Sequence, residues 1–185
     1  MTKTLIFTAT YNEKENINLL IKSITEIDDN LNILIIDDNS PDGTGELLLD
    51  LKKNLKNLKI IIREKKLGLD TAHKLAYDYA IKNQYNKLIT MDADLSHDPI
   101  EIPKIIKLLD IHSFVIGSRY MGGGSADMSF FRKLLSSLGN KIIKLTLKTG
   151  CNEHTSSYRG FNINKLINFD LKIVNSKGYS FFMET

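Results

Sequence analysis

Short apolar runs alternate with longer amphipathic segments over the first 118 residues of this 185-residue chain. In the amphipathic segments the apolar residues recur at the three- and four-residue spacing of one helix face. The apolar runs predict strands over residues 4–9, 31–36, 59–63, 87–91 and 113–118. The segments between them predict helices over residues 13–27, 45–55, 69–81 and 100–109, the last of these with Pro103 in its first turn. The alternation predicts right-handed βαβ units, and therefore an α/β fold with a mainly parallel central sheet.

Polar residues follow four of the five predicted strands. Ligands of open α/β sheets bind outside the carboxyl ends of the strands, so these side chains are expected to share one site. They are Tyr11 and Glu13, Asp37 and Asp38, Asp92 and Asp94, and Arg119. Together they predict a site for a nucleotide and a metal ion.

Asp92 and Asp94 stand two residues apart where the fourth apolar run ends. Carboxylate oxygens suit Mg²⁺ or Mn²⁺, and Mg²⁺ commonly takes one or two protein carboxylates, completing its shell with water and substrate phosphates. The alternative interpretation is that one Asp caps the helix that starts at Pro99 and the other is a solvated turn residue.

Several protein classes are disfavoured by what the sequence lacks. No G-x-G-x-x-G follows the first strand and no Walker A sequence occurs, which argues against a dinucleotide dehydrogenase or a P-loop NTPase. The single cysteine, Cys151, cannot form an internal disulfide. No apolar run approaches the roughly 20 residues that span a bilayer, and the N-terminus lacks a signal-peptide pattern. We therefore expect a cytoplasmic protein, or one that is peripheral on the cytoplasmic face of a membrane.

Positive charge is concentrated in the second part of the chain. Residues 104–185 hold 12 of the 25 Lys and Arg but only 5 of the 22 Asp and Glu. Residues 129–148 form a basic amphipathic helix candidate, which either lies in a lipid interface or packs on a core with a solvated face. Before it, Gly122, Gly123 and Gly124 form either a lid or a plain linker.

Several motifs, kept in order along the chain, together resemble a known family. They are Thr10-Tyr11-Asn12-Glu13, Ile36-Asp37-Asp38-Asn39-Ser40-Pro41-Asp42-Gly43-Thr44-Gly45, Lys66-Leu67-Gly68-Leu69, Met91-Asp92-Ala93-Asp94-Leu95-Ser96-His97-Asp98-Pro99, Gly117-Ser118-Arg119-Tyr120, Thr155-Ser156 with Tyr158-Arg159, and Gly178-Tyr179. The chain resembles the inverting family 2 glycosyltransferases, and within them the dolichol-phosphate (polyprenol-phosphate) mannosyltransferases. The resemblance implies a single three-layer, Rossmann-like GT-A domain over residues 1–185.

The resemblance also implies an activity, which is metal-dependent transfer of a hexose to dolichyl or polyprenyl phosphate. The hexose is expected to be mannose from GDP-mannose, with Mg²⁺ or Mn²⁺ as the cofactor. A lipid phosphate is largely ionised at pH 7, so such an acceptor needs no strong general base. A lipid acceptor favours the membrane-surface interpretation of residues 129–148, and no nucleic-acid partner is expected.

The same resemblance assigns roles to individual residues. Asp94 and Arg119 are implied as catalytic, and Asp92 and Asp94 as metal ligands. Arg132 and Ser136 are implied to hold the acceptor phosphate. The residues implied to bind the donor are Ala9, Tyr11, Glu13, Ile36 and Asp38 around the nucleoside, with Asp38 facing the base, then Asp92, Ala93 and Asp94 at the ribose and diphosphate, and Arg119 at the phosphates.

Departures from the family pattern leave alternatives open. Ala9 stands where the family has Pro, and Asp70 and His73 replace Gly and Tyr. The family continues beyond the region of Gly178, so a shortened domain is expected here. An inactive homologue that binds nucleotide or a partner protein is therefore one alternative. A haloacid-dehalogenase-like phosphatase is a weaker one, since Ser96 stands where that family has Thr or Val.

Overall fold

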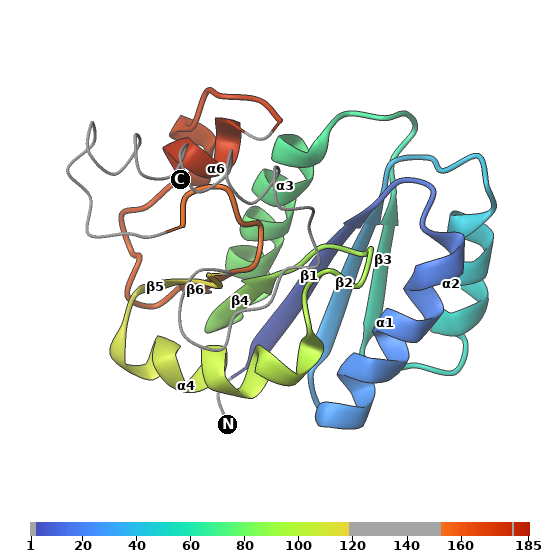
Figure 1. The fold of residues 1–185 in the computed structure, drawn as a ribbon, viewed down its shortest axis with the longest axis horizontal. Coiled ribbons are helices and arrows are strands. Elements are labelled where there is room, and N and C mark those ends of the chain that lie inside the picture. Colours follow the sequence, from blue (N-terminus) through green and yellow to red (C-terminus); the bar gives the residue numbers. More distant parts are fainter. Residues whose placement is uncertain (1–2, 119–152, 179) are drawn as a thin grey trace, which may run out of the picture.

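A computed structural model describes residues 3–118, 153–178 and 180–185. Its six-stranded sheet has the order β3-β2-β1-β4-β6-β5 (Figure 1). The strands are β1 (Thr4–Thr10), β2 (Asn32–Asp37), β3 (Leu58–Ile62), β4 (Lys87–Thr90), β5 (Phe114–Ile116) and β6 (Arg159–Asn162). β1 pairs in parallel with β2 and β4, and β2 pairs in parallel with β3. The predicted α/β fold with a mainly parallel sheet is confirmed.

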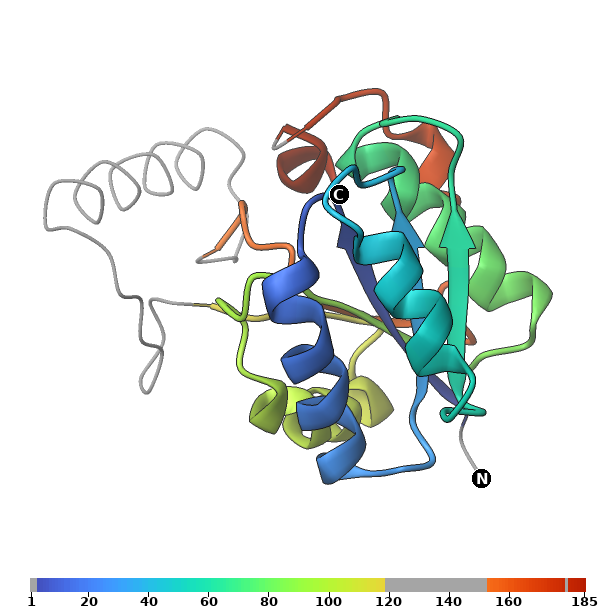
Figure 2. The ribbon, with the colours of Figure 1, turned by 90° about the vertical axis from the view of Figure 1, so that its right-hand side faces the viewer.

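Helices cover both faces of this sheet, which gives three layers (Figures 1 and 2). The elements α1 (Lys14–Ile27), α2 (Thr44–Lys52) and α4 (Ile102–Ile111) lie on one face. The other face carries α3 (Leu69–Lys82), the 3₁₀ turn η2 (Leu171–Ile173) and α6 (Ser180–Glu184). Because β1 is covered on both sides, its residues are apolar in succession instead of alternating: Ile6 packs toward α1, whereas Leu5 and Phe7 pack toward α3.

The expected helix over residues 100–109 divides into two pieces. A 3₁₀ turn, η1 (Pro99–Glu101), precedes α4. Asp98 starts this turn, because its side chain accepts the backbone N–H of Ile100 at 3.0 Å. Pro103 falls at the second position of α4, where the backbone N–H that it lacks would have had no partner within the helix.

The sheet is mixed because β6 enters it antiparallel, between β4 and β5. The polar-to-aromatic piece at residues 155–161 thus contributes a strand from Arg159 onward. Gly160 lets this strand approach α4, since a Cβ there would lie 2.8 Å from Ile105 Cγ2 and 2.9 Å from Leu109 Cδ1. Arg159 is almost completely buried, and its Nη2 donates to the carbonyl oxygens of His154 and Phe182.

The C-terminal segment packs over α3 through aromatic side chains. The imidazole of His73 lies 5.0 Å from the Phe182 ring and 5.1 Å from the Phe7 ring, centroid to centroid. None of the helices in the described ranges is both long and apolar enough to cross a membrane. The helix predicted over residues 129–148 lies outside those ranges.

Candidate functional site

The loops after β1 and β2 are joined to each other by backbone-to-side-chain hydrogen bonds. The N–H of Asn12 donates to Ser40 Oγ at 2.9 Å, and the N–H of Glu13 donates to Thr44 Oγ1 at 3.1 Å. The N–H of Lys14 donates to Asp42 Oδ2 at 3.1 Å. The first turn of α1 is thus held by side chains that precede or start α2.

Asp37 and Asp42 accept the hydrogen bonds that organise this junction. Asp37 is buried, and it accepts hydrogen bonds from Thr10 Oγ1 at 2.8 Å and from the Ser40 hydroxyl at 2.6 Å. Asp42 Oδ1 accepts from the hydroxyl and the N–H of Thr44. Desolvation acts to raise the pKa of Asp42, but the hydrogen bonds from Thr44 and Lys14 outweigh it and lower that pKa. Both aspartates therefore act here as structural acceptors.

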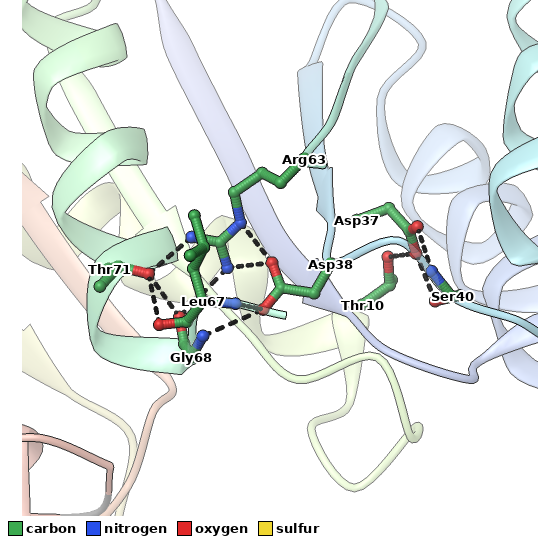
Figure 3. A network of polar contacts seen from close by, with 8 residues as sticks. All are labelled: Thr10, Asp37, Asp38, Ser40, Arg63, Leu67, Gly68 and Thr71. Carbon is green, nitrogen blue, oxygen red and sulfur yellow. Dashed lines mark hydrogen bonds and ion pairs between the residues drawn. The ribbon is translucent and has the colours of Figure 1, made fainter. Parts of the chain in front are cut away.

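Asp38, the residue after β2, takes part in a buried ion pair (Figure 3). The guanidinium of Arg63 contacts Asp38 Oδ1 through both Nε and Nη2. The backbone N–H groups of Leu67 and Gly68 each donate to Asp38 Oδ2 at 3.1 Å. Arg63 also donates from Nη1 to Thr71 Oγ1 at 2.6 Å and from Nη2 to the Gly68 carbonyl at 3.1 Å. The ends of β2 and β3 and the start of α3 are thereby tied together.

Tyr11 and Glu13 border the same region from the β1 side. The Lys66 ammonium lies 3.6 Å from the centroid of the Tyr11 ring, and the Tyr11 residue is 37% exposed. Glu13 Oε2 accepts a hydrogen bond from Asn16 Nδ2 at 2.9 Å. The Tyr11–Lys66 contact therefore bridges the loops after β1 and β3, on either side of the loop that carries Asp38.

Two predicted donor-binding residues lie deeper. The Ile36 side chain is completely buried in the core that faces α3, and Ala9 packs against that core. The Ile36 side chain thus supports its strand and only its backbone is available to face a ligand, whereas Ala9 is partly exposed.

The loop that carries Asp92 and Asp94 is held by its own polar groups. The Asp92 N–H donates to His97 Nδ1 at 3.0 Å, and the Ser96 N–H donates to Asp94 Oδ1 at 3.0 Å. Leu95 has a positive φ of 62°, a conformation that turns the chain sharply after Asp94. Asp98, and not Asp92 or Asp94, caps the next helical turn. The alternative interpretation, in which Asp92 or Asp94 is the helix cap, is therefore wrong about the capping residue.

Tyr158 supports this loop from the strand β6 side. Its ring stacks on His97, and its hydroxyl donates to the Asp98 carbonyl at 3.0 Å. Burial raises the pKa of this hydroxyl, and the nearby charges of Glu101 and Asp98 raise it further. The phenol therefore remains a hydrogen-bond donor throughout the physiological pH range.

The donor set of this loop fits a hard divalent cation. The Asp92 side chain is half-buried and Asp94 is exposed, so carboxylate oxygens of both remain within reach of a ligand. No group of three or more metal-binding side chains occurs in the part of the chain that the structure describes. Two carboxylates match the usual Mg²⁺ site, in which water and substrate phosphates supply the remaining ligands.

Some predicted site residues lie outside the described ranges, and other residues of the site were not predicted. The predicted site residues outside the described ranges are Arg119, Arg132 and Ser136. The residues that were not predicted are Arg63, Thr71, Ser40, Thr44, His97 and Tyr158, which hold the predicted carboxylates and loops in place. Asp70 is buried, and its Oδ1 accepts the Gly178 N–H at 3.4 Å.

The sequence of this chain is similar to those of known proteins. Residues 5–168 match the family model described as glycosyl transferase family 2. The chain is 35% identical over 182 residues to the polyprenol monophosphomannose synthase of Mycolicibacterium smegmatis, covering 97% of this chain and 69% of that protein. It is 30% identical over 180 residues to the undecaprenyl-phosphate mannosyltransferase of Micrococcus luteus, covering 97% and 74%.

Solved structures share the fold at lower identity. Glucosyl-3-phosphoglycerate synthase from Mycobacterium tuberculosis, in complex with Mn²⁺, UDP and phosphoglyceric acid, superposes with a TM-score of 0.66 at 16% identity. A mannosyltransferase from Pyrobaculum calidifontis, in complex with GDP-Man and Mn²⁺, gives a TM-score of 0.58 at 17% identity. The matches cover 98% and 89% of this chain but only 62% and 46% of those chains, so less than two thirds of each.

Proposed function

Because this chain belongs to glycosyl transferase family 2, we propose that it transfers mannose from GDP-mannose to a polyprenyl phosphate. Support comes from the two curated relatives, both named for mannose transfer to a polyprenyl phosphate and matched over more than two thirds of their length. The observation that carries the proposal is the Asp92–Asp94 loop, which follows β4 beside the interlocked loops of β1 and β2.

Asp92 and Asp94 would hold the divalent ion, and the Mn²⁺ complexes among the structural neighbours support a metal of this kind. Such an ion, Mg²⁺ or Mn²⁺, neutralises negative charge on a departing nucleoside diphosphate. His97 and Tyr158 orient the loop, since each contacts its backbone. The nucleoside would lie against Tyr11 and Glu13, above the Asp38–Arg63 pair.

The acceptor side of the proposal rests on residues outside the described ranges. Arg119 would bind the donor phosphates in a bidentate way, and Arg132 with Ser136 would hold the acceptor phosphate. That phosphate is already ionised at pH 7, so in-line attack on the anomeric carbon proceeds without a general base and inverts its configuration. Residues 129–148 would place the protein on the membrane surface that contains the lipid.

Nucleotide binding tests the donor half of the proposal. Calorimetric titration with GDP, GDP-mannose, UDP and UDP-glucose, each with and without Mn²⁺, should show Mn²⁺-dependent binding that is strongest for the guanine nucleotides. Asp94→Ala should abolish the Mn²⁺-dependent component. Asp98→Asn is the matched control, because it changes a carboxylate of the same loop but keeps the capping oxygen. Unchanged Mn²⁺-dependent affinity in Asp94→Ala would refute the metal assignment.

Transfer of radiolabelled mannose to polyprenyl phosphate then tests the reaction itself. Label in the lipid fraction that requires Mn²⁺ and disappears in Asp94→Ala supports a transferase. Nucleotide binding without any transfer would identify the chain as a binding homologue and overturn the catalytic proposal.

A further inference from the structure

The loop that carries Asp92 and Asp94 engages one carboxylate oxygen of each residue. The Ser96 N–H donates to Asp94 Oδ1 at 3.0 Å, and His97 Nε2 lies 3.8 Å from Asp92 Oδ2. Within residues 3–118, 153–178 and 180–185, no hydrogen bond or ion pair involves Asp92 Oδ1 or Asp94 Oδ2. Each aspartate therefore keeps one oxygen available for a cation.

The hydrogen bond to Asp92 fixes which nitrogen of the His97 ring carries the proton. His97 Nδ1 accepts the Asp92 N–H at 3.0 Å, so Nδ1 is unprotonated and the ring N–H is on Nε2. At 3.8 Å, the contact of Nε2–H with Asp92 Oδ2 is longer than a hydrogen bond and acts through electrostatic attraction. One imidazole thus contacts both the backbone and the carboxylate of Asp92.

Packing keeps the His97 ring in this orientation. Its side chain is 9% exposed, and the ring stacks on Tyr158 at a centroid distance of 4.9 Å. Turning the ring would break this stack and leave the Asp92 N–H without its acceptor, which is unfavourable for a partly buried group. The Nε2–H is therefore held beside Asp92 Oδ2, while the Asp92 side chain itself is 37% exposed.

The number of oxygens that each carboxylate offers bears on the choice of cation. Mg²⁺ prefers a compact octahedral shell, whereas Ca²⁺ takes a larger and more flexible shell and often binds both oxygens of a carboxylate. Mn²⁺, like Mg²⁺, is bound octahedrally by oxygen ligands. Because a donor already lies beside one oxygen of each aspartate, binding of an ion by both oxygens of one carboxylate is disfavoured. The arrangement suits the smaller cations.

We propose that His97 is a positioning residue that selects the cation. By holding Asp92 Oδ2, it limits Asp92 to one metal-binding oxygen and so favours Mg²⁺ or Mn²⁺ over Ca²⁺. The His97 side chain acts through Asp92 and does not bind the ion itself. This inference rests on the proposed function, since it assumes that Asp92 and Asp94 hold a divalent ion.

Three substitutions separate the roles of the two ring nitrogens. His97→Asn brings an amide oxygen near the Nδ1 position, where it accepts the Asp92 N–H, and has no group at the Nε2 position. His97→Gln reaches the Nε2 position with an amide N–H. His97→Phe keeps a ring over Tyr158 and has neither nitrogen.

The ratio between cation affinities is the readout. With GDP present, the electron paramagnetic resonance signal of free Mn²⁺ gives its dissociation constant, and competition against Mn²⁺ gives those of Mg²⁺ and Ca²⁺. In His97→Asn and His97→Phe, the ratio of Ca²⁺ affinity to Mn²⁺ affinity should rise by roughly tenfold. In His97→Gln and in the control His112→Asn, which changes an exposed imidazole, this ratio should stay within about twofold of wild type. A purely structural role of His97 would instead weaken all three ions by a common factor.

Hydrogen exchange tests the backbone contact of His97 without any ion or nucleotide. The Asp92 amide should exchange about tenfold faster in His97→Gln and His97→Phe than in wild type and His97→Asn. Equal exchange in all four proteins would overturn the assignment of Nδ1 as its acceptor, and with it the placement of the ring N–H on Nε2.

The outcomes separate this inference from the function on which it rests. Normal Mn²⁺ binding in wild type, with an unchanged ratio of Ca²⁺ to Mn²⁺ affinity in His97→Asn and His97→Phe, would overturn this inference alone. If wild type with GDP binds none of the three cations, the metal assignment of the proposed function fails and this inference fails with it. Urea denaturation shows whether each variant is folded, and the Asn and Phe variants each test the ratio independently.

Discussion

The phenol ring of Tyr158 lies flat on the imidazole of His97, with their centroids 4.9 Å apart and their planes 16° from parallel. His97 Nδ1 accepts the Asp92 N–H, and the Tyr158 hydroxyl donates to the Asp98 carbonyl. A residue just before β6 thereby fixes both ends of the loop that carries the two predicted metal ligands.

Removing the Tyr158 ring should therefore weaken metal-dependent nucleotide binding. Tyr158→Phe keeps the stack and loses one hydrogen bond, for which we expect a loss of about 1 kcal/mol of stability and little change in affinity. Tyr158→Leu loses the stack as well, and the affinity for GDP with Mn²⁺ should fall at least fivefold. Calorimetric titration measures the affinity, and urea denaturation the stability.

Tyr77→Phe is the control for the two Tyr158 variants, because the Tyr77 hydroxyl donates to the Phe169 carbonyl on the α3 side of the sheet. It should leave nucleotide affinity unchanged. Equal affinities for wild type and Tyr158→Leu would show that the stacking of Tyr158 on His97 does not support the loop that carries Asp92 and Asp94.

The buried imidazole of His73 makes stability depend on pH. Burial among aromatic rings, together with the nearby charge of Arg159, lowers the pKa of His73 to about 3. The unfolded chain binds a proton at this residue below pH 6.5 and the folded chain does not, so stability is lost as the pH falls from 6.5 toward 3. The slope for this one group is at most about 1.4 kcal/mol per pH unit.

Replacing His73 with Phe removes this titration but keeps an aromatic ring in the cluster. The difference in unfolding free energy between pH 7.5 and pH 5 should shrink by up to about 2 kcal/mol in His73→Phe. His112→Gln, which changes an exposed imidazole, should keep the wild-type pH dependence. The same steep loss of stability in His73→Phe as in wild type would contradict this account. Urea titrations at several pH values provide the measurement.

Much of the fold could be predicted because it rests on local patterns. Apolar runs and helical spacing placed β1–β4 and α1–α4 within a few residues of their observed bounds. The position of β6 between β4 and β5 could not be predicted, since it depends on pairing between residues far apart in the sequence, such as Thr90 with Arg159, 69 positions away, and Ile116 with Arg159, 43 positions away. Such long-range pairing leaves no periodic signal in the sequence.

The site shows the same division between what is local and what is not. The carboxylates at strand ends were predictable from their place after apolar runs. The residues that hold these carboxylates in place were not predictable, because they are distant in the sequence. Arg63 contacts Asp38, and Tyr158 contacts the loop that carries Asp92 and Asp94. The burial of the Ile36 side chain in the core could not be predicted either, because the residues of its strand are apolar in succession and do not alternate.

Gly160 is expected to tolerate no side chain. The added Cβ of Gly160→Ala would lie within 3 Å of Ile105 and Leu109 of α4, and relieving this contact requires the helix or the strand to move. We expect a loss of about 1–3 kcal/mol in unfolding free energy. Gly45→Ala is the control, since its Cβ would lie 3.4 Å from Ile62 Cδ1 and 3.7 Å from Asp37 Oδ2, which are ordinary contacts. Because Gly45 lies in α2, this substitution should be neutral or slightly stabilising. Similar stabilities for the two variants would contradict the packing argument.

Thr44 should couple stability to nucleotide binding. Its buried hydroxyl accepts the Glu13 N–H and donates to Asp42, so Thr44→Val leaves the Glu13 N–H without this acceptor. We expect a loss of about 1–3 kcal/mol in stability and a several-fold weaker GDP affinity. Thr25→Val changes a threonine that bonds only carbonyls of its own helix, and it should leave affinity unchanged. An unaltered GDP affinity in Thr44→Val would show that the junction of the two loops is irrelevant to binding.

The antiparallel entry of β6 has an evolutionary consequence. The Gly117 N–H donates to the Tyr158 carbonyl at 2.8 Å, and Ile116 faces Arg159 in the sheet. Gly117 and Tyr158, 41 positions apart in the sequence, are thus neighbours, and the segment between them starts and ends at adjacent points of the fold. Lengthening a loop whose ends are already together costs only about 0.6 kcal/mol per doubling. Natural variation or a chimeric graft can therefore exchange residues 120–152, with Arg132 and Ser136 proposed to hold the acceptor phosphate, while the residues proposed to bind the nucleotide, Arg119 included, stay unchanged.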